Sequence, residues 1–128
     1  MHQPAGFQTV VPYVFVNDAA EFLRFLADGL GAREVLRHAE GDRIAHAQVL
    51  IGDAVMMVSD TAADFPAMPS SFYLYTDNAD QAVAKAIAAG AVLISEVEDK
   101  PYQDRQGGVR DCWGNIWWIS QRLTDAPY

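Results

Sequence analysis

The stretch TVVPYVFVNDAAEFLRFLADGLGA, residues 9–32, predicts a strand followed by a helix. Its first eight residues are rich in valine and aromatics, which is typical of a buried strand. Asn17 or Asp18 can cap the helix, and Glu21 stands three residues after Asp18, in the capping-box position. Phenylalanine and leucine side chains then recur at helical spacing. The stretch therefore predicts one strand–helix unit.

A second stretch, SFYLYTDNADQAVAKAIAAGA at residues 71–91, repeats this arrangement. Placing Asp18 on Asp77 also places Gly31 on Gly90 without a gap, and such self-similarity indicates an internal repeat. Asp77 is then the predicted cap of the second helix, and the two glycines end their helices.

Each helix leads into three further strand-like segments. In the first half these are REVLRHA, RIAHAQVLIG and AVMMVSD, and VLISEVE begins the second set. We therefore expect two βαβββ modules, one at about residues 9–60 and one at about 71–121, joined by a proline-containing linker at about 61–70. Because neither module can cover both faces of its own sheet, we expect a single α+β domain, residues 1–128, with a curved mixed sheet.

Composition excludes several classes of protein. With 51% hydrophobic and 20% charged residues the chain is typical of a globular protein. A formal charge of −8 disfavours nucleic acid and anionic membranes as partners. The single cysteine, Cys112, excludes an internal disulfide. We see neither a signal peptide nor an apolar run long enough to span a bilayer, so we expect a cytoplasmic protein.

Three segments carry a family resemblance: VVPYVFVNDAAEFLRFLADGLGAREV, AHAQVLIGDAVMMVSD and YQDRQGGVRDCWGNIWWIS. Together, over roughly residues 9–121, they resemble the vicinal oxygen chelate superfamily of glyoxalase I, bleomycin-resistance proteins and extradiol dioxygenases. The details look closest to the PhnB-like branch, whose last stretch reads D-R-x-G and then D-P-x-G-[NH]-x-W. The resemblance implies the tandem-module fold and a homodimer.

Metal-dependent members of that superfamily place one ligand on the first and last strand of each module. Carried over one at a time, these positions fall at Val11 or Pro12, near Met57, at Ser71 and at Trp118. Such side chains do not form the four-ligand set of histidine, glutamine and glutamate that a divalent metal needs. We therefore expect no metal and no cofactor.

The resemblance implies a concave, aromatic-lined cavity. Its candidate lining residues are Tyr13, Phe15, His46, Met57, Tyr75, Trp117 and Trp118, with Tyr102 and Arg105 at the rim. Strand alternation places Trp117 and Trp118 on opposite faces, so only one of them can face the cavity. The carry-over favours Trp118, which stands where relatives have a metal-binding glutamate.

His46 is the candidate catalytic residue. Alternation places it on one face with Ile44 and Gln48, where it can act as a general base or donate a hydrogen bond to a ligand. PhnB-like relatives often have a histidine here. The alternative is a strand histidine that bonds to a neighbouring side chain.

Arg105 and Arg110 frame the polar segment QDRQGGVR. Two guanidinium groups near a cavity mouth can grip a carboxylate or phosphonate. The alternative is that Arg105 pairs with Asp104 or Asp99 and orders the loop.

Two functions compete. The first is a non-catalytic protein that binds a small organic molecule, for which the acidic surface favours a cationic ligand. The second is a metal-independent glyoxalase-like lyase or isomerase with His46 as general base. A dimeric scaffold, whose cavity is filled by side chains, is a third possibility.

Overall fold

The structure is a computed structural model, and it describes residues 2–128. The chain divides into two compact units, unit 1 up to Met68 and unit 2 from Pro69 onward. The boundary lies inside the expected linker, in which Ala62 and Phe65 exchange two backbone hydrogen bonds of 3.0 Å. No helix among residues 2–128 is long and apolar enough to cross a membrane.

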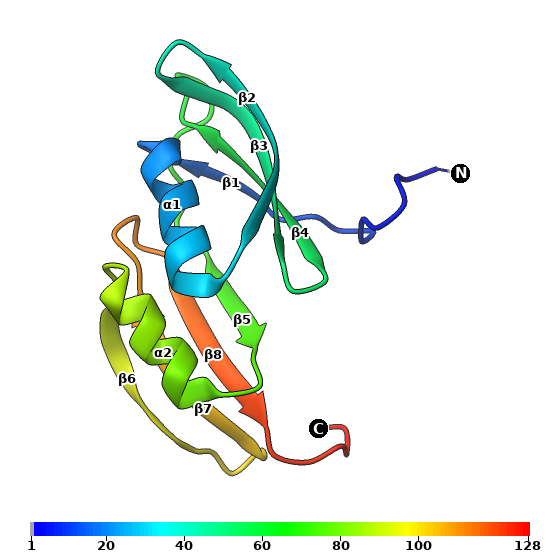
Figure 1. The fold of residues 1–128 in the computed structure, drawn as a ribbon, viewed down its shortest axis with the longest axis vertical. Coiled ribbons are helices and arrows are strands. Elements are labelled where there is room, and N and C mark those ends of the chain that lie inside the picture. Colours follow the sequence, from blue (N-terminus) through cyan, green and yellow to red (C-terminus); the bar gives the residue numbers. More distant parts are fainter. Residues whose placement is uncertain (1) are drawn as a thin grey trace. The chain divides into compact units, whose positions relative to one another are not determined.

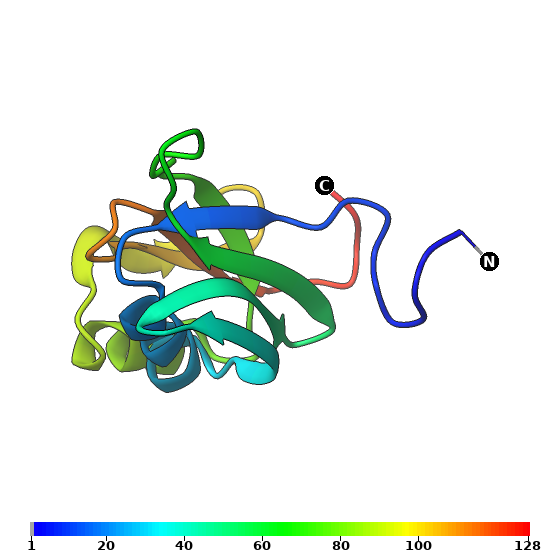
Figure 2. The same ribbon diagram turned by 90° about the horizontal axis from the view of Figure 1, so that it is seen from above.

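Unit 1 contains one helix and a four-stranded sheet of order β1-β4-β3-β2 (Figure 1). Its elements are β1 (Tyr13–Val16), α1 (Ala19–Leu30), β2 (Arg33–Glu40), β3 (Arg43–Ile51) and β4 (Ala54–Asp60). The first strand runs parallel to the last, and the other pairings are antiparallel. Helix α1 lies on one face of this sheet (Figure 2).

Unit 2 repeats the arrangement with a sheet of order β5-β8-β7-β6. Its elements are β5 (Ser71–Tyr75), α2 (Ala79–Ala88), β6 (Val92–Asp99), β7 (Asp104–Arg110) and β8 (Ile116–Arg122). Again the first strand pairs in parallel with the last. The α+β class and the two tandem βαβββ modules are thus confirmed. Because each module pairs its own first and last strands, the expected curved sheet is divided at the module boundary into two sheets.

Each core lies between a helix and one face of its sheet. In unit 1 the fully buried side chains include Phe22 and Leu26 of α1 and Val49 and Val58 of the sheet. In unit 2 alanine and valine replace phenylalanine and leucine on the buried side of the helix, and Trp117 is the largest fully buried side chain of the sheet. The buried residues of this unit include Val83, Ala86, Val109, Trp117 and Ile119.

At neither N-terminus does the side chain of a predicted cap make a capping bond. Asp18 is the N-cap of α1, but its backbone is left-handed (φ 58°) and its side chain makes no capping bond. The carboxylate of Asp60, on β4, instead accepts from the backbone N–H of Ala19 at 2.9 Å. A carboxylate at this position satisfies one of the free N–H groups of the first turn.

Helix α2 is capped by Asn78 rather than by Asp77. The Asn78 side chain accepts from the backbone N–H of Gln81 at 3.0 Å. In addition, Gln121 Oε1 on β8 accepts from the backbone N–H of Ala79 at 3.0 Å. In both modules, therefore, a side chain near the end of the last strand ties down the start of the helix.

The DCWGN segment between β7 and β8 is a turn built around a buried carboxylate. Asp111 accepts from the backbone N–H groups of Trp113 and Asn115, each at 2.9 Å. Its other oxygen accepts from the indole N–H of Trp117 at 2.9 Å. The aspartate and asparagine of this motif thus have a structural role, because they satisfy the buried polar groups of the turn.

Candidate functional site

The contacts of α2 identify the two faces of the unit 2 sheet. Arg105 pairs with Asp80 at the start of the helix, and Gln121 accepts from the first N–H of the helix. These side chains therefore face α2. Since successive side chains of a strand alternate, their neighbours lie on the face without a helix. This helix-free face of unit 2 carries Ser71, Tyr73, Tyr75, Asp104, Gln106, Gly108, Trp118, Ser120 and Arg122.

Trp118 lies flat over Gly108 on this face. A Cβ atom placed on Gly108 would lie 2.7 Å from Cζ3 of Trp118, closer than two carbon atoms can approach. The indole N–H of Trp118 donates to Ser71 Oγ at 2.9 Å. The ring is therefore fixed by a hydrogen bond at one end, and it can lie on the sheet because Gly108 has no side chain beneath it.

Trp117 points the other way, as alternation predicts. It is 2% exposed and stacks on Phe72 with ring centroids 4.5 Å apart. Trp117, one of the candidate lining residues, thus lies in the core, where its ring packs on Phe72 and its N–H group donates to Asp111. Trp118 is the tryptophan on the helix-free face.

A cavity of about 380 Å³ opens beside Trp118. It is lined by Tyr73, Ser95, Lys100, Tyr102, Gln106 and Trp118. Lys100 is paired with Glu98, with 2.6 Å between Nζ and Oε1. Three of the six lining residues are thus aromatic, and Gln106 and Ser95 supply uncharged polar groups.

Gln106 is buried and held at both ends. Its carbonyl oxygen accepts from the hydroxyl of Tyr102 at 2.6 Å, and its amide nitrogen donates to Ser120 Oγ at 2.7 Å. These two bonds fix the orientation of the amide and hold the Tyr102 ring against the sheet.

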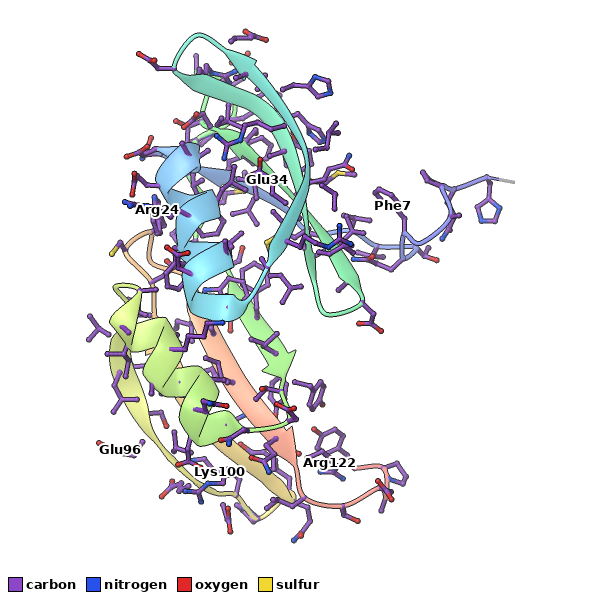
Figure 3. All side chains as sticks on the ribbon, in the orientation of Figure 1. Phe7, Arg24, Glu34, Glu96, Lys100 and Arg122 are labelled. Atoms are coloured by element: carbon purple, nitrogen blue, oxygen red, sulfur yellow. The ribbon has the colours of Figure 1, made fainter. Side chains whose placement is uncertain are left out.

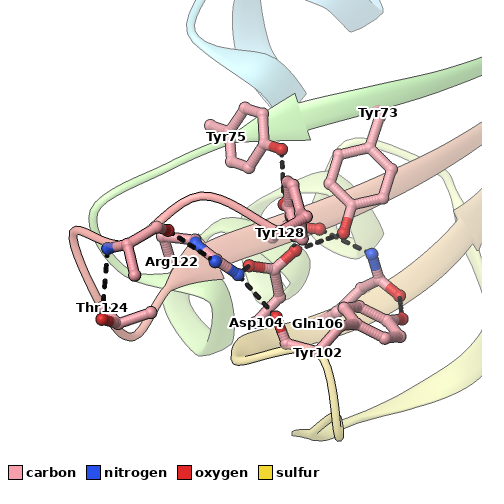
Figure 4. A network of polar contacts seen from close by, with 10 residues as sticks. Tyr73, Tyr75, Tyr102, Asp104, Gln106, Arg122, Thr124 and Tyr128 are labelled. Carbon is pink, nitrogen blue, oxygen red and sulfur yellow. Dashed lines mark hydrogen bonds and ion pairs between the residues drawn. The ribbon is translucent and has the colours of Figure 1, made fainter.

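Asp104 is the centre of a polar network next to this cavity (Figure 4). Its side chain is fully buried and accepts from the hydroxyls of Tyr73 and Tyr128, the second at 2.6 Å. Arg122 Nη1 donates to the other carboxylate oxygen at 3.0 Å. Burial raises the pKa of Asp104, but the hydrogen bonds from Tyr128, Tyr73 and Arg122 outweigh it and lower the pKa below its ordinary value. The carboxylate is therefore ionised at neutral pH.

A second cavity, of about 420 Å³, lies where the chain leaves β8. It is lined by Pro101, Tyr102, Gln103, Arg122, Thr124, Ala126, Pro127 and Tyr128. The guanidinium carbon of Arg122 lies 4.1 Å from the ring centroid of Tyr128. Tyr102 lines both cavities.

In unit 1, His46 lies on the helix-free face of the sheet between two polar partners. Its Nδ1 is 3.1 Å from the hydroxyl of Tyr13, and its Nε2 is 3.0 Å from Nε2 of Gln48. The amide nitrogen of Gln48 donates, so His46 Nε2 accepts and Nδ1–H donates to the hydroxyl of Tyr13; both ring nitrogens are thus in hydrogen bonds.

Ile44 does not share the face of His46, contrary to the prediction. The pairing of β2 with β3 shifts between His38 and Ala39, where one residue of β2 is matched by two of β3. This bulge at Ala45 reverses the alternation, so Ile44 is buried in phase with Ala47.

The remaining aromatic residues of unit 1 form a cluster on the same face. Tyr13 and Phe15 have ring centroids 5.0 Å apart, and Phe15 stacks on Phe65 at 5.5 Å. Tyr13 is 42% exposed, and Met57, its partner on β4, is half-buried. Met57 and Trp118 are equivalent in the two modules, because each pairs with the first tyrosine of its module.

Arg105, a candidate rim residue, is not among the lining residues of the two cavities described above. Its guanidinium makes two bonds to Asp80, at 2.7 and 3.0 Å, and one to Asp99 at 3.0 Å. The hydrogen bonds of Arg105 hold the pKa of Asp80 below its ordinary value. Of the two partners expected for Arg105, Asp99 is confirmed. The other, Asp104, pairs with Arg122 instead. Arg110 is exposed.

The positions carried over for metal ligands hold other chemistry. Ser71 and Trp118 are hydrogen-bonded to each other. Among residues 2–128, no group of three or more histidine, cysteine, aspartate or glutamate side chains is placed to hold a metal ion.

Several members of the polar network are absent from the predicted site residues, namely Tyr73, Asp104, Gln106, Ser120, Arg122 and Tyr128. One signal for them exists, since counting in twos from Trp118 gives Ser120 and Arg122. The same counting from Gly108 gives Gln106 and Asp104. Tyr128 lies beyond the expected module, and its contact with Asp104 has no local signal.

Comparison with known proteins agrees with this architecture. The family model of the Glyoxalase/Bleomycin resistance protein/Dioxygenase superfamily matches residues 6–119. The protein Rv0887c of Mycobacterium tuberculosis is 27% identical over 127 residues, which cover 90% of this chain and 75% of the relative.

Solved structures show the same fold at lower identity. TioX from Micromonospora sp. ML1 superimposes with a TM-score of 0.78 at 24% identity, covering 91% of this chain and 99% of TioX. TnmS3, an antibiotic binding protein from Streptomyces sp. CB03234, has a TM-score of 0.69 at 19% identity, with 94% and 99% covered. With the family model matching most of its length, this chain belongs to the glyoxalase/bleomycin resistance protein/dioxygenase superfamily.

Proposed function

We propose that the protein binds a small organic molecule against the aromatic, helix-free face of its second sheet and does not transform it. The observation that carries this proposal is the cavity of about 380 Å³ beside Trp118. Its volume lies in the range of small-molecule sites, which combine apolar walls with a few placed polar groups. Tyr73, Tyr102 and Trp118 supply the walls, and Gln106 supplies a fixed amide.

The family gives further support. TnmS3, which has the same fold, is described as an antibiotic binding protein. Members of a superfamily with one fold differ in chemistry, so the argument for this chain rests on its own cavity. An aromatic ligand fits best, because a tryptophan and two tyrosines offer faces for stacking.

The contacts of His46 favour binding over catalysis. A general base needs a nitrogen free to take a proton from the substrate. In this structure Tyr13 and Gln48 engage both ring nitrogens. His46 as the base of a metal-independent lyase or isomerase would first have to break one of these bonds. We therefore propose that it holds Tyr13 in place.

We also propose that the protein belongs to the PhnB-like branch, lies in the cytoplasm, forms a homodimer and has no metal cofactor. Sedimentation equilibrium tests the dimer, and elemental analysis of untagged protein tests the metal. Stoichiometric zinc, nickel, manganese or iron would overturn the metal-free proposal.

A screen tests the binding function. A library of aromatic metabolites and antibiotics is assayed by thermal shift, and the hits are titrated by tryptophan fluorescence. We expect hits whose affinity falls about tenfold or more in Trp118→Leu, because a stacked ring is lost. Trp113→Leu is the matched control, since Trp113 lies in the turn outside the cavity, and it should bind normally.

Hits that bind Trp118→Leu as tightly as the unmodified protein would contradict the proposed site. Turnover of a hit that is abolished in His46→Ala, with binding intact, would instead establish the enzyme.

A further inference from the structure

We propose that Asp104, Tyr75 and Arg122 form a subsite for the hydroxyl group of an aromatic ligand, and that Tyr128 of this chain fills the subsite in the structure. The proposal rests on the binding function above, because it names the chemical class of the ligand. The segment that carries Tyr128 then competes with the ligand and is displaced when the ligand binds.

The geometry around Tyr128 is that of a bound phenol (Figure 4). Its hydroxyl donates to Asp104 Oδ2 at 2.6 Å and lies 2.5 Å from the hydroxyl of Tyr75. The guanidinium of Arg122 lies over the ring, 4.1 Å from its centroid. The polar end and one face of the ring therefore each have a partner of matching chemistry.

Tyr128 adds little to the core of unit 2. It is 71% exposed, although its hydroxyl reaches a fully buried carboxylate. Strand β8 ends at Arg122, and Leu123 donates the next backbone bond, to Gln103 at 2.9 Å. Beyond it, the segment is held by the bond from Arg122 Nη2 to the carbonyl of Ala126 at 2.7 Å. Displacing Tyr128 thus breaks few bonds and leaves the sheet intact.

The charges of the subsite select a neutral hydroxyl. The carboxylate of Asp104 and the guanidinium of Arg122 lie 3.0 Å apart and neutralise each other. An ammonium group would meet Arg122, and a carboxylate would meet Asp104, so each has a like charge nearby. A neutral O–H group donates to Asp104 without this cost.

Tyr73 shows that Asp104 accepts this kind of donor. Its phenolic hydroxyl donates to the same carboxylate oxygen as that of Tyr128. The hydrogen bond to Asp104 raises the pKa of Tyr128, so the phenol keeps its proton at neutral pH. Burial and the bond to Asp104 raise the pKa of Tyr73 in the same direction.

The subsite adjoins the cavity beside Trp118. Tyr73 contacts Asp104 and also lines that cavity, and Tyr102 lines both cavities. A ligand with its hydroxyl at Asp104 can therefore extend its aromatic body toward Trp118. A hydroxylated aromatic molecule larger than a single ring fits this path.

The test uses p-cresol, which has the ring and hydroxyl of tyrosine, and the full chain carrying Tyr128→Ala. Binding is titrated by ligand-observed NMR, with circular dichroism to confirm the fold. We expect Tyr128→Ala to bind p-cresol about tenfold more tightly than the unmodified protein, because a tethered side chain competes at high effective concentration. The probe 4-methylanisole, whose methylated oxygen cannot donate, should not bind.

Asp104→Asn and Tyr75→Phe, each combined with Tyr128→Ala, should abolish or weaken p-cresol binding. If Asp104→Asn does not fold, Tyr75→Phe decides alone, because Tyr75 is exposed and outside the core. Equal binding of p-cresol to Tyr128→Ala and the unmodified protein, or equal binding of 4-methylanisole, would overturn the subsite.

Failure of the subsite is distinguishable from failure of the binding function. Library hits that require Trp118 but are insensitive to Asp104 and Tyr128 would remove the subsite and keep the function. Binding of p-cresol to Tyr128→Ala, with no hit that depends on Trp118, would remove the proposed function and keep the subsite.

Discussion

Tyr13 and Tyr73 occupy equivalent positions in the two modules, but their hydroxyls have different partners. Tyr13 pairs with Met57 and Tyr73 with Trp118, in each case across the parallel first and last strands. The hydroxyl of Tyr13 contacts the imidazole of His46, whereas that of Tyr73 donates to the Asp104 carboxylate. The internal repeat thus keeps the tyrosine and changes the group that it contacts.

This difference predicts unequal costs for removing the two hydroxyls. Tyr73→Phe should lower the free energy of unfolding by about 1 kcal/mol or slightly more, because it removes a hydrogen bond to a charged group. Tyr13→Phe is the matched control, because the two tyrosines are similarly exposed (42% and 46%). It should cost less, because the hydroxyl of Tyr13 contacts the ring of His46 rather than a buried carboxylate. Urea unfolding measures both, and a larger cost for Tyr13→Phe would contradict the assignment.

The Asp104 network predicts a pH dependence of stability. Because the native pKa of Asp104 is lowered, its contribution is present above its unfolded pKa of about 4. It is lost as the pH falls through the lower native value, where the unfolded state binds more protons. Asp104→Asn should therefore be less stable than the unmodified protein at pH 7 by about 1–3 kcal/mol.

Below about pH 4 this gap should narrow, since the carboxyl of the unmodified protein becomes protonated. Urea unfolding from pH 3 to pH 7 measures it. Asp99→Asn provides a comparison, because Asp99 bonds to Arg105 on the exposed surface rather than to the buried network. A gap that stays constant across this range would contradict the ionised, hydrogen-bonded state of Asp104.

Local patterns determine much of the fold. The valine-rich strands, the helical spacing of Phe22 and Leu26 and the left-handed Gly31 after α1 are each readable within a few residues. Strand alternation also separates Trp117 from Trp118 without any structure. These features depend on neighbouring residues, so a sequence alone predicts them.

The missed features depend on residues far apart in the chain. Asp60 and Gln121 cap helices that begin about 40 residues earlier, so no capping motif could reveal them. Asp104 gains its role from Tyr73, Arg122 and Tyr128, which come from different elements. The bulge at Ala45 is set by pairing with β2, and alternation counted along one strand cannot detect it.

The two candidate caps of α2 give a direct test of this point. Asn78→Ala should destabilise the protein by about 1 kcal/mol, because the first turn loses the side-chain acceptor for Gln81 N–H. Asp77→Ala should cost much less, since Asp77 is exposed and is not the N-cap. Thermal or urea unfolding compares them, and the reverse order would restore the cap predicted from sequence.

The packing of Trp118 on Gly108 predicts a coupled pair of substitutions. Gly108→Ala should destabilise unit 2 by about 1–3 kcal/mol, because the new methyl group meets the indole ring and must displace it. Trp118→Leu removes that ring, so in its presence Gly108→Ala should cost distinctly less. A double-mutant cycle by urea unfolding measures the coupling.

Gly107→Ala is the control for this cycle. Its new methyl group would lie 2.7 Å from Val97 and 3.1 Å from Val83, toward the helix rather than toward Trp118. It should therefore be destabilising whether or not Trp118 is present. Additive costs for Gly108→Ala and Trp118→Leu would mean that the ring does not lie on the glycine, and the cavity wall drawn from its position would be wrong.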